Sequence, residues 1–262
     1  MDELIIERKG NVEIVTLNRP EVMNALTYDM VQGLGDLFEA AQADDDIRSI
    51  LLTGAGRAFS TGADLTGKGS ARKDAHTPLG MRISTFGYSR MVNAIWSLEK
   101  PVVCAVNGTA AGASCNLALS CDLVLASDSA KFIQVFVRRG LIPDGGGTYL
   151  LPRLVGLPRA KQLMLLGEDL PAARALEWGL IHRVVPQDRL MDEAMELAER
   201  LAAGPTRAIG MIKSMLNRSL ESDLAAALER EASLQGIAAG TGDFIEGVMS
   251  FLEKRPPAFK GR

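Results

Sequence analysis

The sequence is poor in histidine and cysteine. Its 262 residues include two histidines and three cysteines. None of them shows the His-His, His-Glu or Cys-Cys spacing of a metal site, so we expect no bound metal. Cys104, Cys115 and Cys121 lie among apolar or small residues, which is typical of reduced, buried thiols in a cytoplasmic protein. The sequence therefore predicts neither a metal centre nor a disulfide framework.

Long apolar runs and a strong excess of one charge are also missing. No stretch reaches the length needed to cross a bilayer, and the initial residues MDELIIERKG do not resemble an export signal. A formal net charge of −3 gives no electrostatic reason to expect nucleic acid or an anionic membrane as a partner. We expect a cytoplasmic globular protein that binds neither.

Several catalytic and nucleotide-binding motifs are absent. The glycine-rich segment GAGRAFSTG lacks the Lys-Ser/Thr ending of a P-loop and the full dinucleotide-binding spacing. The sequence has no G-x-S-x-G element of a serine hydrolase. Neither histidine has a partner in the sequence: we expect His76 to be exposed in a polar insert and His182 to pack at a strand end.

The hydrophobic pattern predicts an α/β protein. NVEIVTLNRP alternates as a strand does and ends at Pro20, and Thr27 can cap a helix whose apolar residues follow helical spacing. Short apolar runs predict buried strands in RSILLTG, PVVCAVNG and CDLVLAS. The polar insert at 66–80 is expected to be a mobile surface loop.

Helical patterns dominate after about Pro158, and the strand pattern nearly vanishes. We expect residues 1–190 to form a strand-rich core that carries the ligand site and residues 191–262 to form a helical region. The helical patterns lie in RAKQLMLLG, AARALEWG, RLMDEAMELAERLAAG, TRAIGMIKSMLNRSL and DFIEGVMSFLEK.

Two segments can present backbone N–H groups to a ligand. FSTGADL places a glycine before Ala63 after an apolar strand, and NGTAAGASCNLALSCD runs from a strand into a helix beginning near Ala113. Amides at a helix N-terminus are unpaired and would stabilise a carbonyl oxygen that becomes negative. The residues alone also fit tight packing between strand and helix, so both interpretations stay open here.

Taken together, five segments resemble the crotonase superfamily, the enoyl-CoA hydratase/isomerase proteins, in order and spacing over essentially the whole chain. The segments are NRPEVMNAL, AFSTGADL, VNGTAAGASCNLALSCDLVLAS, IPDGGGTYLLPRLVG and AARALEWGLIHRVV. The resemblance implies a spiral of ββα turns followed by C-terminal helices that mediate trimerisation, so a homotrimer or hexamer is expected. It also implies an acyl-CoA thioester as ligand, no separate cofactor, and an enolate held by the amides of Ala63 and Ala113.

The sequence departs from the hydratases of that family at their two catalytic glutamates. Alignment places Asn116 and Phe136 at these positions. Adding water across a double bond needs a base and an acid, so these replacements disfavour simple hydration. Phe136, with Phe132 nearby, suggests an apolar wall for a ring or an alkyl chain. Asn116 is either a satisfied helix residue or a hydrogen-bond partner of the substrate or of Asp144.

Asp144, in GLIPDGGGTYLLPR, is the candidate catalytic carboxylate. An aspartate eight residues after Phe136 matches the one used by several isomerases of the family and by its chlorobenzoyl-CoA dehalogenase. The alternative is an ordinary turn or helix-cap aspartate. The resemblance further implies contacts of CoA with Arg19, Asp64 and Leu65. It also implies that CoA contacts Phe259 and Lys260 of a neighbouring subunit. The lysine often found in the family shortly after the GAD motif is missing here.

We therefore expect an acyl-CoA isomerase that acts through a thioester enolate, most similar to the family's isomerases of aromatic epoxide thioesters in phenylacetate degradation. A Δ3-Δ2-enoyl-CoA isomerase or an enoyl-CoA hydratase of fatty-acid metabolism is the alternative. A dehalogenase with Asp144 as nucleophile and His76 as helper is more remote. A noncatalytic member that binds acyl-CoA is the alternative from another class, and the acidic pI argues against RNA binding.

Overall fold

The computed structural model describes residues 2–66 and 77–262. Most of the polar insert, including His76, lies outside the described residues. The end of the insert corrects the expectation of a loop, because Pro78 begins helix α2 (Pro78–Ser97). The Thr77 side chain caps this helix by accepting a hydrogen bond from the Gly80 amide. A threonine followed by proline is a typical helix start. The polar composition of the insert led to the prediction of a loop over this start.

The strands of the described residues form two sheets. Neighbouring strands are parallel except for the β1–β2 and β8–β9 pairs. In spatial order, one sheet contains β1 (Leu4–Lys9), β2 (Val12–Leu17), β3 (Ser49–Gly54), β5 (Val102–Val106), β7 (Leu123–Ser127) and β10 (Arg183–Val185). The other contains β4 (Ala58–Ser60), β6 (Thr109–Ala111), β8 (Lys131–Ile133) and β9 (Asp169–Pro171).

The two sheets are built by one repeated turn of the chain. A strand of the larger sheet is followed at once by a strand of the smaller one, as in β3–β4, β5–β6 and β7–β8. Helices α2 and α3 (Ala113–Ser120) connect these turns. Because the repeat places β4 and β6 side by side in parallel, the segments that follow them begin next to each other.

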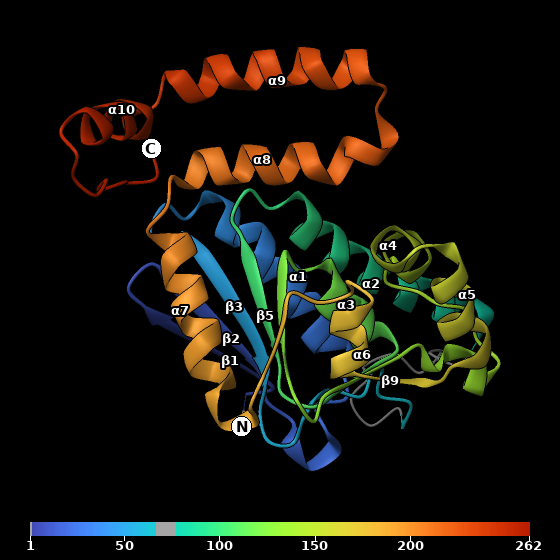
Figure 1. Cartoon of the computed structure of the whole chain (residues 1–262). Helices are drawn as coiled ribbons and strands as arrows, with labels where there is room; N and C mark the ends of the chain where they lie inside the picture. Colours follow the sequence, from blue (N-terminus) through green and yellow to red (C-terminus); the bar gives the residue numbers. More distant parts are fainter. Residues whose placement is uncertain (1, 67–76) are drawn as a thin grey trace.

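The larger sheet is covered by helices on both faces, which explains the continuous apolar runs of its strands. On one face, Ile50 and Val102 join a core cluster with residues of α1 (Tyr28–Ala43) and α2. On the other, Leu51 and Val103 pack with α7 (Leu190–Ala202), which contacts β3 and β5 and runs beside β3 in Figure 1. Thr27 caps α1 as predicted, accepting a hydrogen bond from the Met30 amide.

The remaining helices lie around the smaller sheet and at one end of the molecule. Figure 1 shows α8 beside the core, with α9 and α10 beyond it. Residues 224–239 were not among the predicted helices, yet they form α9. The helices are α4 (Gly147–Val155), α5 (Leu157–Leu166), α6 (Ala172–Glu177), α8 (Thr206–Arg218), α9 (Leu224–Ala239) and α10 (Gly242–Leu252). Within the described ranges, no helix is both long and apolar enough to cross a membrane.

Candidate functional site

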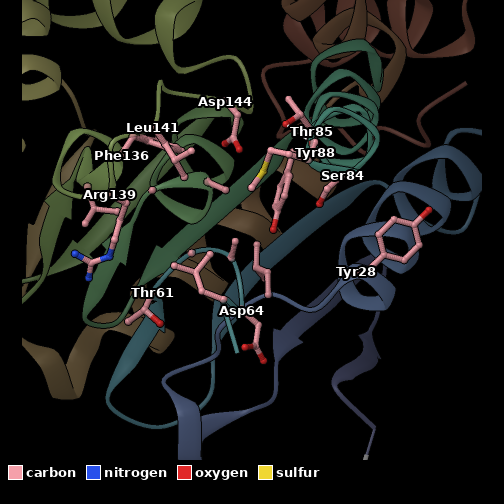
Figure 2. Close-up of a pocket in the computed structure, with 18 residues that line it drawn as sticks. Tyr28, Thr61, Asp64, Ser84, Thr85, Tyr88, Phe136, Arg139, Leu141 and Asp144 are labelled. Carbon is pink, nitrogen blue, oxygen red and sulfur yellow. Dashed lines mark hydrogen bonds between the residues drawn. The ribbon is translucent and has the colours of Figure 1, made fainter. Parts of the chain in front are cut away.

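A cavity of about 200 Å³ opens where β4 and β6 end, between α2 and the segment before α4. Its walls are mostly apolar, with a few polar groups (Figure 2). The lining residues are Leu26, Tyr28, Thr61, Gly62, Ala63, Asp64, Leu65, Met81, Ser84, Thr85, Tyr88, Gly112, Ala113, Val135, Phe136, Arg139, Leu141 and Asp144.

Ala63 and Ala113 line this cavity together, and the role of their amides as oxyanion donors stays a prediction. Ser60 pairs with Ala110 in the β4–β6 ladder, so the two chains leave the sheet together. Gly62 has a φ of +94°, and a Cβ on it would lie 2.8 Å from the Ala111 carbonyl oxygen. Only glycine permits this approach without a shift of the backbone. We call the N–H groups of Ala63 and Ala113 the paired amides.

The paired amides are free to bind a ligand oxygen. Within residues 2–66 and 77–262, neither N–H donates a backbone hydrogen bond. Ala113 is the first residue of α3, where the helix leaves its N–H groups unpaired and partly positive. A hydroxyl pair joins the two segments, since the Ser60 and Ser114 oxygens are 2.5 Å apart. Ser60 donates to the Asn24 carbonyl, so Ser114 supplies the proton between the two serines.

Asp144 is the unpaired carboxylate of the cavity. Figure 2 shows its side chain directed into the cavity. Burial raises its pKa to about 6, and a hydrogen bond from its own backbone offsets this only in part. Its Oδ1 atom is buried and has no hydrogen-bond partner among the described residues. A carboxylate with a pKa near neutrality and a free oxygen is suited to accept and return a proton.

Asn116 holds the Asp144 backbone and does not line the cavity. Its amide nitrogen donates to the Asp144 carbonyl at 2.7 Å, and its oxygen accepts from Gln134 at 2.8 Å. A Cβ on Gly147 would lie 2.4 Å from the Asn116 nitrogen, so the glycine lets α4 approach the amide. The two predicted roles coincide here, because Asn116 is a buried helix residue with a satisfied amide and one of its hydrogen bonds goes to the Asp144 backbone. A contact of Asn116 with substrate stays a prediction.

Asp64 also lines the cavity, but its carboxylate already has partners. Arg19 forms an ion pair with it at 2.9 Å, and the Thr66 backbone and hydroxyl both donate to it. Burial alone would raise its pKa, yet the hydrogen bonds and the Arg19 charge bring the pKa below its ordinary value. Leu65 is exposed at the rim of the cavity, and Arg19 stands behind Asp64 without lining it.

The other predicted residues lie in different places. Phe136 is buried and forms part of the cavity wall, whereas Phe132 belongs to the core of the described chain and does not line the cavity. Phe259 and Lys260 lie at α10, against Asp243 and Gly247 of their own chain. A contact from a neighbouring subunit stays a prediction. His182 is exposed, so the expectation that it packs at a strand end is wrong; only its backbone amide joins β7.

One face of α2 was missed by sequence reasoning. Met81, Ser84, Thr85 and Tyr88 line the cavity at intervals of three and four residues. This helical spacing was the available signal, but the polar insert before it hid the start of the helix. The other lining residues that were not predicted as site residues are Leu26, Tyr28, Thr61, Gly62, Gly112, Val135, Arg139 and Leu141.

The cavity combines donors for an oxyanion with one free base. In the part of the chain that the structure describes, no group of three or more His, Cys, Asp or Glu side chains could hold a metal ion. The chemistry available to this chain's own residues is proton transfer at a carbon whose neighbouring carbonyl oxygen contacts the paired amides. A two-sheet spiral with a cavity at its strand ends is the arrangement that the resemblance to the crotonase superfamily implies.

Comparison with known proteins identifies the family. The enoyl-CoA hydratase/isomerase family model matches residues 7–262, and the chain belongs to this family. It is 43% identical to 1,2-epoxyphenylacetyl-CoA isomerase of Escherichia coli K12, with all of both chains covered. It is 36% identical to short-chain-enoyl-CoA hydratase of Clostridium acetobutylicum over 100% of this chain and 99% of that one.

A solved structure confirms the fold. The enoyl-CoA hydratase of Bacillus anthracis matches with a TM-score of 0.93 at 31% identity, and the match covers 100% of both chains. The predicted α/β crotonase fold is therefore correct. The names of the relatives include both hydratases and isomerases, so the family membership defines an enzyme family rather than one reaction.

Proposed function

We propose that the protein is an acyl-CoA isomerase that acts through a thioester enolate, with 1,2-epoxyphenylacetyl-CoA as the favoured substrate. The observation that carries the proposal is which carboxylates of the cavity have hydrogen-bond or ion-pair partners. Of the two carboxylates in the described lining, Asp64 is engaged by Arg19 and Thr66, while Asp144 is free. A single free base suffices for isomerisation but not for the acid and base steps of hydration.

The proposed reaction begins with Asp144 removing a proton from the carbon next to the thioester carbonyl. The electron pair of the broken C–H bond moves onto the carbonyl oxygen, and the amides of Ala63 and Ala113 hold the resulting enolate. When the electrons return, the double bond shifts or the epoxide C–O bond opens. Asp144 or water then returns the proton at another position, so no other reactant is needed.

The size of the cavity supports a compact acyl group. Its volume of about 200 Å³ exceeds the roughly 150 Å³ of an apolar protein cavity that binds benzene. Phe136, Leu141 and Leu26 supply apolar surface for a ring. The similarity to an epoxide isomerase gives a further reason to prefer the aromatic epoxide over a linear enoyl chain.

The test is the Asp144→Asn variant, which keeps the shape of the side chain and removes the base. We expect isomerisation of the epoxide to fall by on the order of a hundredfold or more while CoA binding is retained. Asp188→Asn is the matched control, because Asp188 is exposed on a short helical turn away from the cavity. Unchanged turnover by Asp144→Asn would overturn the assignment.

A substrate panel separates the alternatives. We expect turnover of 1,2-epoxyphenylacetyl-CoA, weaker shift of the double bond in 3-hexenoyl-CoA and negligible hydration of crotonyl-CoA. Robust hydration would mean that Asp144 alone activates water, and the hydratase alternative would then hold. Stabilisation by acyl-CoA in a thermal melt, with turnover of no thioester, would identify a noncatalytic binding protein.

A further inference from the structure

Tyr88 is a buried hydroxyl-bearing residue of the cavity to which the proposed reaction assigns no role. It lies on α2 with 6% of its surface exposed, and it contacts the cavity. Figure 2 shows its ring beside Asp144 and its hydroxyl directed into the cavity, toward Asp64. Within the described residues the hydroxyl makes no hydrogen bond, and its oxygen is not one of the fully buried unpartnered atoms, so it is open to the cavity. A buried tyrosine normally pairs its O–H group, so this one is available to a ligand.

The hydroxyl can act only as a neutral donor or acceptor. Burial raises the pKa of Tyr88 well above its ordinary value, and the nearby negative charges of Asp144 and Asp64 raise it further. The phenol therefore keeps its proton throughout the range in which Asp144 ionises. In an apolar wall, a ligand that offers no acceptor leaves this O–H unpaired, and that penalty discriminates between ligands.

Two other polar groups of the cavity wall already have partners within the protein. The Thr85 hydroxyl donates to the Met81 carbonyl within α2. Asp64 accepts from Arg19 and Thr66. On the proposed function, the thioester oxygen is bound by the paired amides, so the acceptor for Tyr88 has to be a second oxygen atom of the ligand.

We propose that the Tyr88 hydroxyl donates a hydrogen bond to an oxygen atom carried by the acyl group near its α- and β-carbons. The site thereby selects oxygen-bearing acyl-CoA thioesters over hydrocarbon ones of similar size. Tyr88 is a specificity-determining residue on this proposal, and Asp144 remains the base. The inference deepens the proposed function and rests on it for the placement of the thioester.

The kinetic test compares wild type with Tyr88→Phe, which keeps the ring and removes only the hydroxyl. We expect kcat/KM for the epoxide thioester to fall roughly tenfold, the scale of one lost neutral hydrogen bond. The loss for 3-hexenoyl-CoA should be at least fivefold smaller. Equal losses for both substrates, or no loss for either, would overturn the proposal. Tyr149→Phe is the matched control, because the Tyr149 hydroxyl bonds to Glu221 outside the cavity.

A binding test keeps this proposal separate from the proposed function. Calorimetry compares 3-hydroxybutyryl-CoA, which carries an oxygen on the β-carbon, with butyryl-CoA, which does not. We expect wild type and Tyr149→Phe to bind the hydroxylated thioester more tightly, and Tyr88→Phe to lose that preference. A preference that survives in Tyr88→Phe, or is absent from wild type, would reject the role of Tyr88. Absence of turnover by wild type would reject the proposed function alone.

Discussion

At the scale of single residues, the raised pKa of Asp144 follows from burial of a carboxylate that neighbouring side chains do not pair. Its backbone carbonyl accepts from Asn116, but its carboxylate oxygen Oδ1 has no partner among the described residues. Burial without a compensating charge raises the pKa of Asp144 to about 6. Asp64 shows the opposite arrangement, because Thr66 and Arg19 outweigh its burial. Two aspartates of one cavity are thus suited to different tasks.

The raised pKa of Asp144 predicts the pH dependence of the reaction. The proposed mechanism needs the ionised carboxylate, so kcat/KM should be constant above about pH 7 and fall tenfold per unit well below pH 6. The measurement is a pH–rate profile for the epoxide thioester, with circular dichroism at each pH to confirm folding. A profile that stays flat between pH 4.5 and 7 would show that another group is the base.

The same shift predicts that Asp144 destabilises the folded protein at neutral pH. Its pKa is about 6 when folded against 3.8 ordinarily, so the folded state binds the proton more tightly. The stabilising contribution of that proton is complete below about pH 3.8 and is lost as pH rises through about 6. At pH 7.5, the free energy of unfolding of Asp144→Asn should exceed that of wild type by on the order of 1–3 kcal/mol.

Chemical denaturation measures this difference at two pH values. The gain from Asp144→Asn should shrink toward zero near pH 4, where the wild-type carboxyl is protonated in the folded state. A variant that is less stable than wild type at pH 7.5 would mean that the carboxylate makes stabilising contacts that outweigh its burial. Asp188→Asn is again the control, since its exposed carboxylate should change stability little at either pH.

At the scale of elements, the site depends on two strand ends that lie in contact. Gly62 follows β4 and approaches the carbonyl of Ala111, the last residue of β6, so closely that no side chain fits. The short β4–β6 ladder, with Ser60 opposite Ala110, sets this approach. The paired amides therefore converge because of the pairing of two three-residue strands and not because of any local turn alone.

Gly62→Ala should separate the paired amides. The new Cβ would lie 2.8 Å from the Ala111 oxygen at a φ of +94°, so the backbone has to move. We expect at least a tenfold loss of kcat together with a lower free energy of unfolding, because a misplaced oxyanion donor costs about 10²–10³ in rate. Steady-state kinetics and denaturation measure both quantities.

Gly10→Ala is the matched control for this substitution. Gly10 has a φ of +58°, but a Cβ on it would meet nothing within 4 Å. The control therefore shares the conformational cost of a left-handed alanine, roughly 1 kcal/mol, without the clash. If Gly62→Ala and Gly10→Ala have equal kinetics, the close approach at Gly62 has no catalytic importance.

Some elements followed from the sequence and others did not. The buried strands β3, β5 and β7 were predicted because their apolar runs reflect burial on both faces. Strand β1 was not predicted, since it lies at the sheet edge and is mostly exposed. Helix α9 was missed because none of its residues is buried within the chain. Its apolar residues also do not gather on one face of the helix, so the sequence shows no clear helical pattern.

At the scale of the whole molecule, the C-terminal helices expose many large apolar side chains. Phe251 is 81% exposed, although such a side chain is normally buried. We propose that these helices pack on other copies of the chain, as a homotrimer or hexamer. The exposed apolar residues of α8 to α10 are Ile212, Leu216, Leu224, Leu228, Ile237, Phe244, Ile245, Val248, Met249, Phe251 and Leu252.

Removal of the chain after Glu253 tests this assembly. The tail is bound to its own chain, since Asp243 accepts from the Lys260 and Gly261 amides and Arg48 donates to the Phe259 carbonyl. We expect truncation to weaken both assembly and acyl-CoA affinity, because Phe259 and Lys260 are proposed to contact CoA in a neighbouring subunit. Light scattering and calorimetry measure the two effects.

The outcomes separate the two roles of the tail. A full-length monomer with full acyl-CoA affinity would exclude both assembly and a contact between subunits. A trimer that survives truncation but loses affinity would keep the CoA contact and reject the role of the tail in assembly. The free energy of unfolding has to be measured alongside, because the truncation also removes an acceptor from Arg48.

The sequence by itself determined the fold class, and it singled out the two segments around Ala63 and Ala113 and the carboxylate of Asp144 as candidates. Strand burial, glycine positions and motif order are local properties, so they can be read along the chain. Only the tertiary structure showed that Asp144 lacks a partner while Asp64 has several, and that Tyr88 faces the same cavity from α2. Burial and pairing depend on residues distant in sequence, and those contacts exist only once the two sheets and α2 come together.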